Sequence, residues 1–436
     1  MARPFIPYLT LLHSFLPFAA CAAALLLAGC ATTPPAVQPP ATASVPTAPG
    51  VSPPQPGETA EEAGFAAWVQ AFARDAVTAG IRPATVQTAL AAARLQPRVI
   101  ELDRAQPEFT RPPWAYLDSA VSPQRIAQGR AKREEYRAPL DAAAARYGVP
   151  AAIVTAVWGM ESNYGANFGS FSAIDALATL GFEGRRRDWA RGELLTALRI
   201  IDSGDIDAAH MVGSWAGAMG NTQFLPSVFL AYAVDADGDG RRDIWGSMAD
   251  VAASTANFLA HVGWQPGQPW GAEVQLPPGF DYARAELTQR QPAAQWAAEG
   301  VRSIDGQPLP DLPDASVITP AGARGPAFLA GANFRAILRY NNSVNYALAV
   351  GLLAQQIEGG AGTAGVVAPW PRDLQPLARE QLRALQVALN ERGFDAGTPD
   401  GVMGPATRAG LRRYQQSIGA VADGYPTLEL LARLLQ

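Results

Sequence analysis

Both cysteines of the chain, Cys21 and Cys30, lie within the first 30 residues, so the rest of the chain has no thiol. That part can therefore contain no disulfide, thiolate zinc site or cysteine nucleophile. Histidine is almost as scarce, because only His210 and His261 follow. Two histidines are too few for a His-rich zinc site, and they give little support for a Ser/His/Asp triad. We therefore expect a fold held by its hydrophobic core, with chemistry that rests on carboxylates.

The length and charge of the chain narrow the possibilities further. A chain of 436 residues is long enough for about two to four domains, each with a sizeable core. Lys and Arg together number 34 against 39 Asp and Glu, which gives a net charge of −5. A nucleic-acid-binding protein normally shows a basic stripe, so we expect no nucleic-acid partner.

Residues 1–29 have the features of a secretory signal peptide, with Arg3 near the start and a mostly apolar stretch after it. The stretch ends in Leu27-Ala28-Gly29-Cys30, which resembles the bacterial lipobox, where the chain is cut before the cysteine and its thiol is acylated. An ordinary membrane anchor and a simple signal peptide are the alternatives. Ala31 follows the cysteine, and by resemblance to known sorting rules this implies an outer-membrane lipoprotein lipidated at Cys30, with its body in the periplasm.

Residues 30–60 are expected to form an extended tether. The segment from 31 to 60 contains 9 Pro among Ala, Thr, Ser and Val, with almost no charge and no regular period. From Phe65 the pattern becomes helical, because Phe65, Trp68 and Phe72 follow the spacing i, i+3, i+7. Pro83 then stands where a further helix could begin.

The remaining chain predicts a mainly α protein of α+β type. Helical segments alternate with Gly and Pro breaks as far as about residue 262. Between about 265 and 325, Gly, Pro and Gln with short alternating runs predict a small β-containing insert. Helix returns at 326–358, a linker covers 359–372, and residues 373–436 form a compact helical unit.

One carboxylate stands out at the end of an apolar helix. A helical face of apolar residues begins after Pro150 and consists of Ile153, Val154, Val157 and Trp158. Glu161 continues this face, and the chain breaks at Gly165. Burial and the negative end of the helix dipole would both raise the pKa of Glu161. Such a Glu suits general acid catalysis at a glycosidic bond, whereas the alternative is a buried Glu satisfied by a hydrogen bond or by Arg.

The segment around this carboxylate, Trp158-Gly159-Met160-Glu161-Ser162-Asn163-Tyr164-Gly165, resembles the catalytic motif of the membrane-bound lytic murein transglycosylase B family. Four further segments resemble the family in the same order. They are Asp103-Arg104-Ala105-Gln106-Pro107-Glu108-Phe109, Gly213-Ser214-Trp215-Ala216-Gly217-Ala218-Met219-Gly220, Gln223-Phe224-Leu225-Pro226-Ser227 and Arg339-Tyr340-Asn341. The resemblance covers about residues 61–358.

This resemblance implies a lysozyme-like core with helical and small β subdomains around a groove for the peptidoglycan glycan strand. Glu161 would protonate the glycosidic oxygen between MurNAc and GlcNAc and then act as a base while the MurNAc 6-hydroxyl attacks C1. The product would be a 1,6-anhydro end, formed without a catalytic cofactor. Ordinary glycosidases use two carboxylates, and no second one stands out in the matched motifs.

The resemblance also implies substrate-binding residues, carried over by motif position. The expected groove residues are Ser214, Met219, Gln223, Tyr340, Asn341 and Tyr346. The polar ones could instead be helix caps or core hydrogen-bonding groups. Arg186 and Arg187 resemble the basic pair that contacts the stem peptide in this family, and the alternative is a solvated basic face. The chain departs from the family at Asn221, where Gln is more familiar, and at Phe258, where Tyr is frequent.

An Asp-rich loop is a candidate for structural Ca²⁺. Positions 1, 3 and 5 of an EF-hand-like loop are occupied by Asp235, Asp237 and Asp239. Gly240 follows at position 6, and the carbonyl of Arg241 could be the ligand at position 7. Position 12 is Gly246 and not Glu, and family members close a lengthened loop with a downstream Asp, here Asp250. The alternative is an Asp/Gly surface turn.

The C-terminal segment resembles the peptidoglycan-binding domain type 1, a three-helix module. The resemblance rests on its Leu spacing and on Asp400-Gly401 and Asp423-Gly424. An unrelated helical cap is the alternative. A second site on the same polymer would raise the local substrate concentration.

Taken together, these features predict a lipid-anchored periplasmic lytic transglycosylase that acts on peptidoglycan glycan strands. A hydrolytic muramidase would use the same Glu161, with water in place of the 6-hydroxyl, so only the product separates the two. A catalytically silent wall-binding lipoprotein is the alternative from another class. The sequence points to no particular protein partner.

Overall fold

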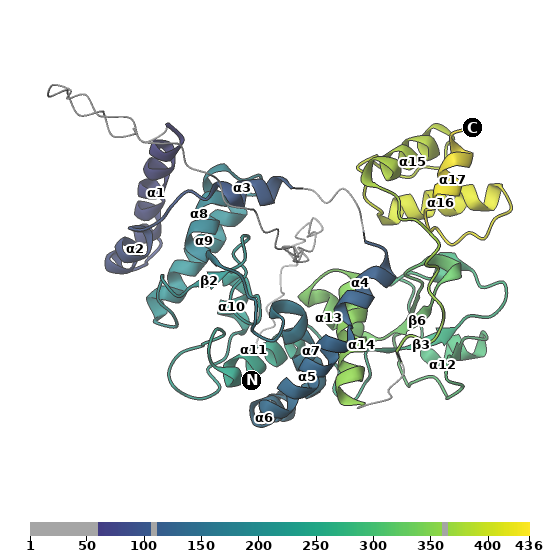
Figure 1. The fold of residues 1–436 in the computed structure, drawn as a ribbon, viewed down its shortest axis with the longest axis horizontal. Helices are drawn as coiled ribbons and strands as arrows, with labels where there is room; N and C mark the ends of the chain where they lie inside the picture. Colours follow the sequence, from purple (N-terminus) through teal and green to yellow (C-terminus); the bar gives the residue numbers. More distant parts are fainter. Residues whose placement is uncertain (1–59, 106–110, 360–364) are drawn as a thin grey trace, which may run out of the picture.

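The computed structural model describes residues 60–105, 111–359 and 365–436 (Figure 1). The predicted signal peptide, Cys30 and nearly all of the predicted tether lie outside the described residues, as do parts of the motif at 103–109 and of the linker. Among the helices of the described ranges, none combines the length and the apolarity that a membrane span needs.

Most of the fold is helical, as predicted. The N-terminal helices, up to the one that carries Glu161, are α1 (Ala60–Thr78), α2 (Pro83–Leu90), α3 (Pro97–Arg104), α4 (Pro113–Ala120), α5 (Pro123–Glu135), α6 (Arg137–Tyr147) and α7 (Ala151–Ser162). The following helices are α8 (Ala173–Glu183), α9 (Arg187–Ser203), α10 (Pro226–Tyr232), α11 (Met248–His261), α12 (Ala293–Ala298), α13 (Ala332–Tyr340) and α14 (Val344–Glu358). The helix that Pro83 predicted is α2.

Local sequence explains where many of these helices begin. Proline occupies the first turn of α2, α3, α4, α5 and α10, where its fixed φ fits and its missing N–H costs no hydrogen bond. Serine side chains cap α5 as well and three other helices, α8, α11 and α14, by accepting from a main-chain N–H in the first turn; these serines are Ser122, Ser172, Ser247 and Ser343.

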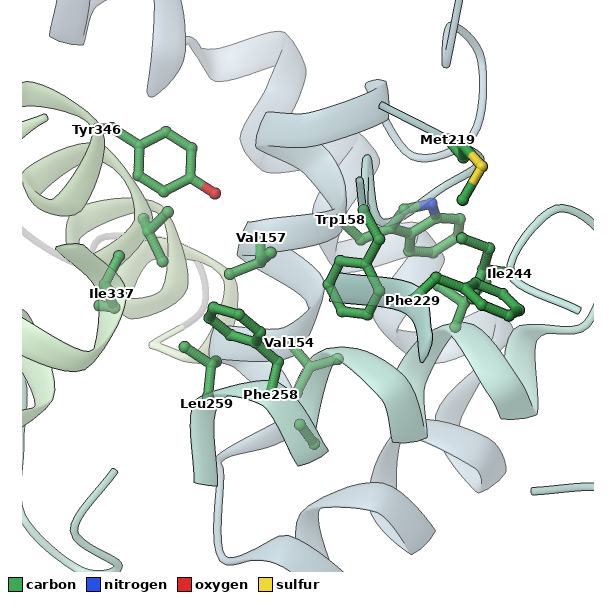
Figure 2. Close-up of a cluster of buried hydrophobic side chains, with 14 of the residues drawn as sticks. Val154, Val157, Trp158, Met219, Phe229, Ile244, Phe258, Leu259, Ile337 and Tyr346 are labelled. Carbon is green, nitrogen blue, oxygen red and sulfur yellow. The ribbon is translucent and has the colours of Figure 1, made fainter. Parts of the chain in front are cut away.

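The main hydrophobic core surrounds α7. Every residue of α7 from Ala151 to Gly159 is buried, and α14 is buried along nearly its whole length. Helices α5, α6, α11 and α14 all pack against α7. Figure 2 shows Val154, Val157 and Trp158 of α7 among side chains from several other elements, including Phe258 of α11 and Ile337 of α13. This burial holds the C-terminal end of α7, and therefore Glu161, in one position.

The predicted β insert is a four-stranded antiparallel sheet with strand order β4-β3-β6-β5. Its strands are β3 (Gly271–Gln275), β4 (Arg302–Ser303), β5 (Ser316–Ile318) and β6 (Ala327–Ala330), with the short 3₁₀ helices η1 (Tyr282–Arg284) and η2 (Gly322–Arg324) between them. A second, two-stranded sheet pairs β1 (Phe171–Ser172) with β2 (Val212–Gly213).

The prediction that helix returns at 326 was wrong for its first residues. Ala327 to Ala330 form the inner strand β6, which pairs with β3 and β5 and is buried at every position. A short apolar run buried on both faces shows no period of two, so its pattern does not separate a strand from a buried helix.

The C-terminal unit is a three-helix module, as predicted, made of α15 (Arg379–Glu391), α16 (Pro405–Ser417) and α17 (Leu428–Leu434). It has its own core, which includes Leu385, Leu389 and Leu411. In Figure 1 the module lies beside the sheet that contains β3 and β6, far from α1 and α2. Polar contacts join it to that part of the fold: Arg412 pairs with Glu286 at 2.7 Å, and the N–H of Ala323 donates to Asp423 at 2.9 Å.

Candidate active site

Glu161 stands in the last turn of α7, one residue before the helix ends. Asn163 and Tyr164 then adopt positive φ values of 51° and 57°, which turn the chain sharply away. The side chain is half-buried. Desolvation raises the pKa of Glu161 to about 7, and a hydrogen bond from Tyr346 acts in the opposite direction. The group is therefore protonated in a large fraction of molecules at neutral pH, as a general acid requires.

Tyr346 is the direct partner of Glu161. Its hydroxyl donates to Oε1 of Glu161 at 2.5 Å. The tyrosine lies in the first turn of α14, and Figure 2 shows its hydroxyl pointing away from that helix, toward the side of the cluster where Val157 lies. Burial and the nearby Glu161 carboxylate hold the pKa of Tyr346 well above its usual range, so the phenol remains a donor.

Two further tyrosines share the electrostatic environment of Glu161. The carboxylate raises the pKa of both Tyr340 and Tyr116, in each case after the larger effect of burial, and that of Tyr116 reaches about 12. Tyr340 was expected at the site, whereas sequence reasoning missed Tyr116. The one sequence feature that could have pointed to Tyr116 is the aromatic pair Trp114 and Tyr116, which directly follows two prolines. Within the described residues no second carboxylate contributes to the pKa of Glu161.

The loop between β2 and α10 carries three of the expected groove residues. The hydroxyl of Ser214 accepts from the N–H groups of Ala216 and Ala218 and so holds the turn at Gly217. Met219 is fully buried and forms an isolated antiparallel β-bridge with Phe224. Gln223 has φ +51° and donates from Nε2 to the carbonyls of Phe168 and Gly220, both at 2.9 Å.

These contacts give the loop residues structural roles. Ser214 and Gln223 are half-buried, so each retains exposed surface, while Met219 has none. Both side-chain hydrogen bonds of Gln223 are donated by its amide nitrogen. Its side-chain oxygen Oε1 accepts no hydrogen bond from another described residue.

Tyr340 and Asn341 end α13. The hydroxyl of Tyr340 donates to the carbonyl of Thr222 at 2.6 Å, which ties α13 to the loop before α10. The ring packs edge-on against Phe258 at 4.9 Å, so the residue that departs from the family lies directly behind an expected site residue. Asn341 is half-buried and is the C-cap of α13.

Asn221, the other departure from the family, is a buried structural group. Its Oδ1 accepts from Nε1 of Trp158 at 2.9 Å, and its Nδ2 donates to the carbonyl of Trp245 at 2.8 Å. It thus joins α7 to the segment before α11.

The structure places Arg186 and Arg187 differently from each other. Arg186 is half-buried, reaches Asp103 at 3.3 Å and lies over the ring of Trp189 at 4.6 Å. Arg187 is exposed and forms no ion pair with another described residue. Asp103 is buried at 6% exposure and also accepts from Arg185. Arg187 is therefore the member of the pair with an available guanidinium.

Three of the predicted metal ligands come together in the Asp-rich loop. Carboxylate oxygens of Asp235, Asp237 and Asp250 lie within 4.8 Å of one another. Asp250 is fully buried, and its pKa is raised by desolvation and by Asp237. Asp239 lies outside this group, where its carboxylate accepts from Arg241. Clustered carboxylate oxygens are what a hard cation requires.

Comparison with known proteins agrees with this geometry. The transglycosylase SLT domain family matches residues 64–355, and a peptidoglycan binding domain family matches residues 378–434. The membrane-bound lytic murein transglycosylase B of Escherichia coli (strain K12) is 34% identical over 249 residues, which are 56% of this chain and 66% of the relative. The chain thus spans just under two thirds of that relative's length.

Solved structures are similar over more of the chain. SltB3 from Pseudomonas aeruginosa, in complex with NAG-anhNAM-pentapeptide, has a TM-score of 0.83 and 51% identity over 85% of this chain and 99% of its own. The Escherichia coli lytic transglycosylase Slt35 in complex with calcium has a TM-score of 0.58 and 30% identity over 69% of this chain and 94% of its own. With its family match covering well over half of its length, this chain belongs to the transglycosylase SLT domain family of peptidoglycan lytic transglycosylases.

Proposed function

We propose that this protein cleaves the β-1,4 bond between MurNAc and GlcNAc of peptidoglycan, with Glu161 as the acid and then the base. The protonated Oε of Glu161 gives its proton to the glycosidic oxygen as the bond from that oxygen to C1 breaks. The carboxylate then takes the proton of the MurNAc 6-hydroxyl, whose oxygen bonds to C1. Glu161 is protonated again, the product is a 1,6-anhydro end, and no water is consumed.

The observation that carries this proposal is the pKa of Glu161, about 7, in a setting of tyrosines. A group with this pKa gives and accepts a proton at neutral pH with little free-energy cost, which a residue acting in both roles needs. The absence of a second carboxylate from its electrostatic neighbours in the described residues favours the scheme with one Glu over the usual pair. The complex of the similar SltB3 with an anhydro-muropeptide supports the same product.

Tyr346 would position the acid, and the remaining site residues would bind the glycan strand. The short bond from Tyr346 orients the Glu161 carboxyl and favours its ionised form after the first proton transfer. The residues proposed to contact sugar are Ser214, Gln223, Tyr340, Asn341 and, through its backbone, Met219. Arg187 would pair with a stem-peptide carboxylate, since Arg186 is engaged with Asp103.

Mass spectrometry of muropeptides released from purified sacculi tests the function. The protein from residue 31 onward and its Glu161→Gln variant are compared on the same sacculi. Anhydro ends, lighter by one water than reducing ends and absent from the mutant digest, are the expected result. Reducing ends would make the protein a hydrolytic muramidase, and no release by either protein, with binding retained, would make it a wall-binding protein.

The protein would act in the periplasm as an outer-membrane lipoprotein acylated at Cys30. The lipobox-like segment supports this, and so does the membrane-bound relative. Labelling cells with a radioactive fatty acid tests it, because Cys30→Ser should abolish incorporation and release the protein from the membrane fraction.

The cluster of Asp235, Asp237 and Asp250 would hold a structural Ca²⁺. The carboxylate geometry supports this, and the similar Slt35 was solved with calcium. The ion would offset the burial and the repulsion from Asp237 that raise the pKa of Asp250, and it would contribute to stability, not to proton transfer.

A further inference from the structure

The C-terminal module contains one helical pattern twice. Arg379, Leu382, Arg383 and Gln386 of α15 recur at one constant offset as Arg408, Leu411, Arg412 and Gln415 of α16. Each copy is followed by an Asp-Gly turn, first Asp400-Gly401 and then Asp423-Gly424.

The two turns are held by the same hydrogen bonds. In the first copy, Nε2 of Gln386 donates to Asp400 at 3.1 Å, and the N–H of Gly401 donates to Oε1 of Gln386 at 2.8 Å. In the second copy, Nε2 of Gln415 donates to Asp423 at 2.7 Å, and the N–H of Gly424 donates to Oε1 of Gln415 at 2.8 Å. In both turns the glutamine donates to Oδ1 of the aspartate, so Oδ2 takes no part in this pair of hydrogen bonds.

In the second copy, this face already holds a ligand from the same chain. Arg408 and Arg412 both pair with the carboxylate of Glu286, at 3.4 and 2.7 Å. Oδ2 of Asp423 accepts from the main-chain N–H of Ala323 at 2.9 Å. The approach is close, because a Cβ built on Gly322 would lie 2.5 Å from Oδ2 of Asp423. The face therefore recognises a carboxylate together with an amide N–H.

In the first copy, the counterparts of Arg412 and Asp423 lie at the surface, whereas Arg379, the counterpart of Arg408, is half-buried and donates to the carbonyl of Asp400 at 3.2 Å. Arg383 and Asp400 are exposed, and within the described ranges Arg383 forms no ion pair and Oδ2 of Asp400 accepts no hydrogen bond from another residue. Nε of Arg383 donates to the carbonyl of Pro399 at 2.9 Å, which holds the guanidinium beside the turn. Pro399 also lines an open hollow of about 540 Å³, together with Asn390, Asp395 and Thr398.

We infer that this first face, with Arg383 and Asp400 at its centre, binds the stem peptide of peptidoglycan. A stem peptide offers both groups that Glu286 and Ala323 supply to the second face, namely a free carboxylate and an amide N–H. Arg383 pairs with the carboxylate, Oδ2 of Asp400 accepts from the amide, and the adjoining hollow receives a peptide side chain. The inference rests on the proposed function in taking the wall polymer as the ligand.

Co-sedimentation with sacculi tests the inference without requiring turnover. The protein from residue 31 carries Glu161→Gln to prevent digestion, and its binding is measured on intact sacculi and on sacculi whose carboxylates have been converted to methylamides. Because one charge-assisted pair contributes about tenfold or more in affinity, Arg383→Ala should weaken binding to intact sacculi about tenfold. On methylamidated sacculi, the protein that keeps Arg383 should bind no more tightly than Arg383→Ala does.

The exposed Arg433 of the same module provides the matched control, because Arg433→Ala removes the same charge and Arg433 does not line the hollow. Unchanged affinity is expected for it, and Asp400→Asn should weaken binding to a smaller degree. Wild-type affinity of Arg383→Ala, or an equal loss in Arg433→Ala, would overturn the inference. So would a loss in Arg383→Ala if methylamidation has no effect, since the face would then bind glycan. A failure of the proposed reaction would appear only in the muropeptide products.

Discussion

Tyr346 and Glu161, 185 positions apart in the chain, share a hydrogen bond of 2.5 Å between the phenol hydroxyl and Oε1. It lowers the pKa of a carboxyl whose pKa burial raises, and the two effects together give a pKa of about 7. The balance of these two effects keeps the group able both to give and to accept a proton near neutral pH.

Replacing Tyr346 by Phe removes this hydrogen bond and should raise the pKa of Glu161 further. The fall in rate at alkaline pH, where the acid loses its proton, should then move to higher pH. Loss of a bond that orients the carboxyl should also lower kcat by about tenfold. The pH profile of glycan-strand cleavage measures both, and a profile whose alkaline limb stays in place would contradict the assignment. Tyr147→Phe, a half-buried tyrosine on α6, is the control.

Glu161→Gln should reduce the rate by about 10²–10⁴-fold, as expected for loss of a general acid. It should also stabilise the fold at high pH. The folded protein holds the Glu161 proton up to about pH 7, whereas 4.5 is the ordinary pKa, so wild-type stability falls between these values as pH rises. Relative to wild type, the free energy of unfolding of the variant should be higher by on the order of 3 kcal/mol above pH 7 and unchanged at pH 4. Urea unfolding at both pH values measures this. If the variant and wild type differ in unfolding free energy by the same amount at both pH values, the pKa of Glu161 is not raised in the folded protein.

Asn221→Ala should destabilise the fold by about 2 to 3 kcal/mol. The substitution leaves Nε1 of buried Trp158 and the carbonyl of Trp245 without their partner. Thermal and chemical unfolding of the variant test this against Asn342→Ala, at an exposed position. Similar unfolding curves for both variants would mean that the Asn221 bonds are replaced by water.

Calcium should raise the melting temperature, and a chelator should lower it. Asp235→Asn should remove the calcium effect because it neutralises one of the three clustered carboxylates. Asp239→Asn should retain most of it, since Asp239 lies outside the cluster. Calorimetric titration and thermal unfolding provide the readout, and equal losses in both variants would require a different ligand set.

Glu286→Ala should weaken the attachment of the C-terminal module. It leaves Arg412, which is 8% exposed, without its carboxylate, at a cost of about 3 kcal/mol. Asp373→Asn breaks the exposed pair with Arg324 and should cost less than about 0.5 kcal/mol. Small-angle scattering and limited proteolysis between α14 and α15 report detachment. Wild-type behaviour of Glu286→Ala would show that apolar contacts hold the module.

Patterns within one element were predictable from the sequence. The apolar face of α7 placed Glu161 at a buried helix end, and Pro83 and Pro150 predicted where α2 and α7 begin. A compact helical unit at the C-terminus was also predictable from its Leu spacing, and its resemblance to a known domain type implied three helices. Strand β6 was not, since four buried apolar residues become a strand only when β3 and β5 lie on either side.

The site itself depends on contacts between distant segments. The sequence by itself determined which carboxylate is enclosed by apolar helix residues and which family the motifs resemble. Only the tertiary structure decided that Tyr116 lies near Glu161 and that Arg186 pairs with Asp103, while Arg187 has no ion-pair partner among the described residues. It also decided that one of the two matching faces of the module is occupied by Glu286 and Ala323. Helix periodicity is set by neighbours in the chain, whereas these pairings follow from how α4, α7, α14 and the sheet pack together, and no local pattern encodes that packing.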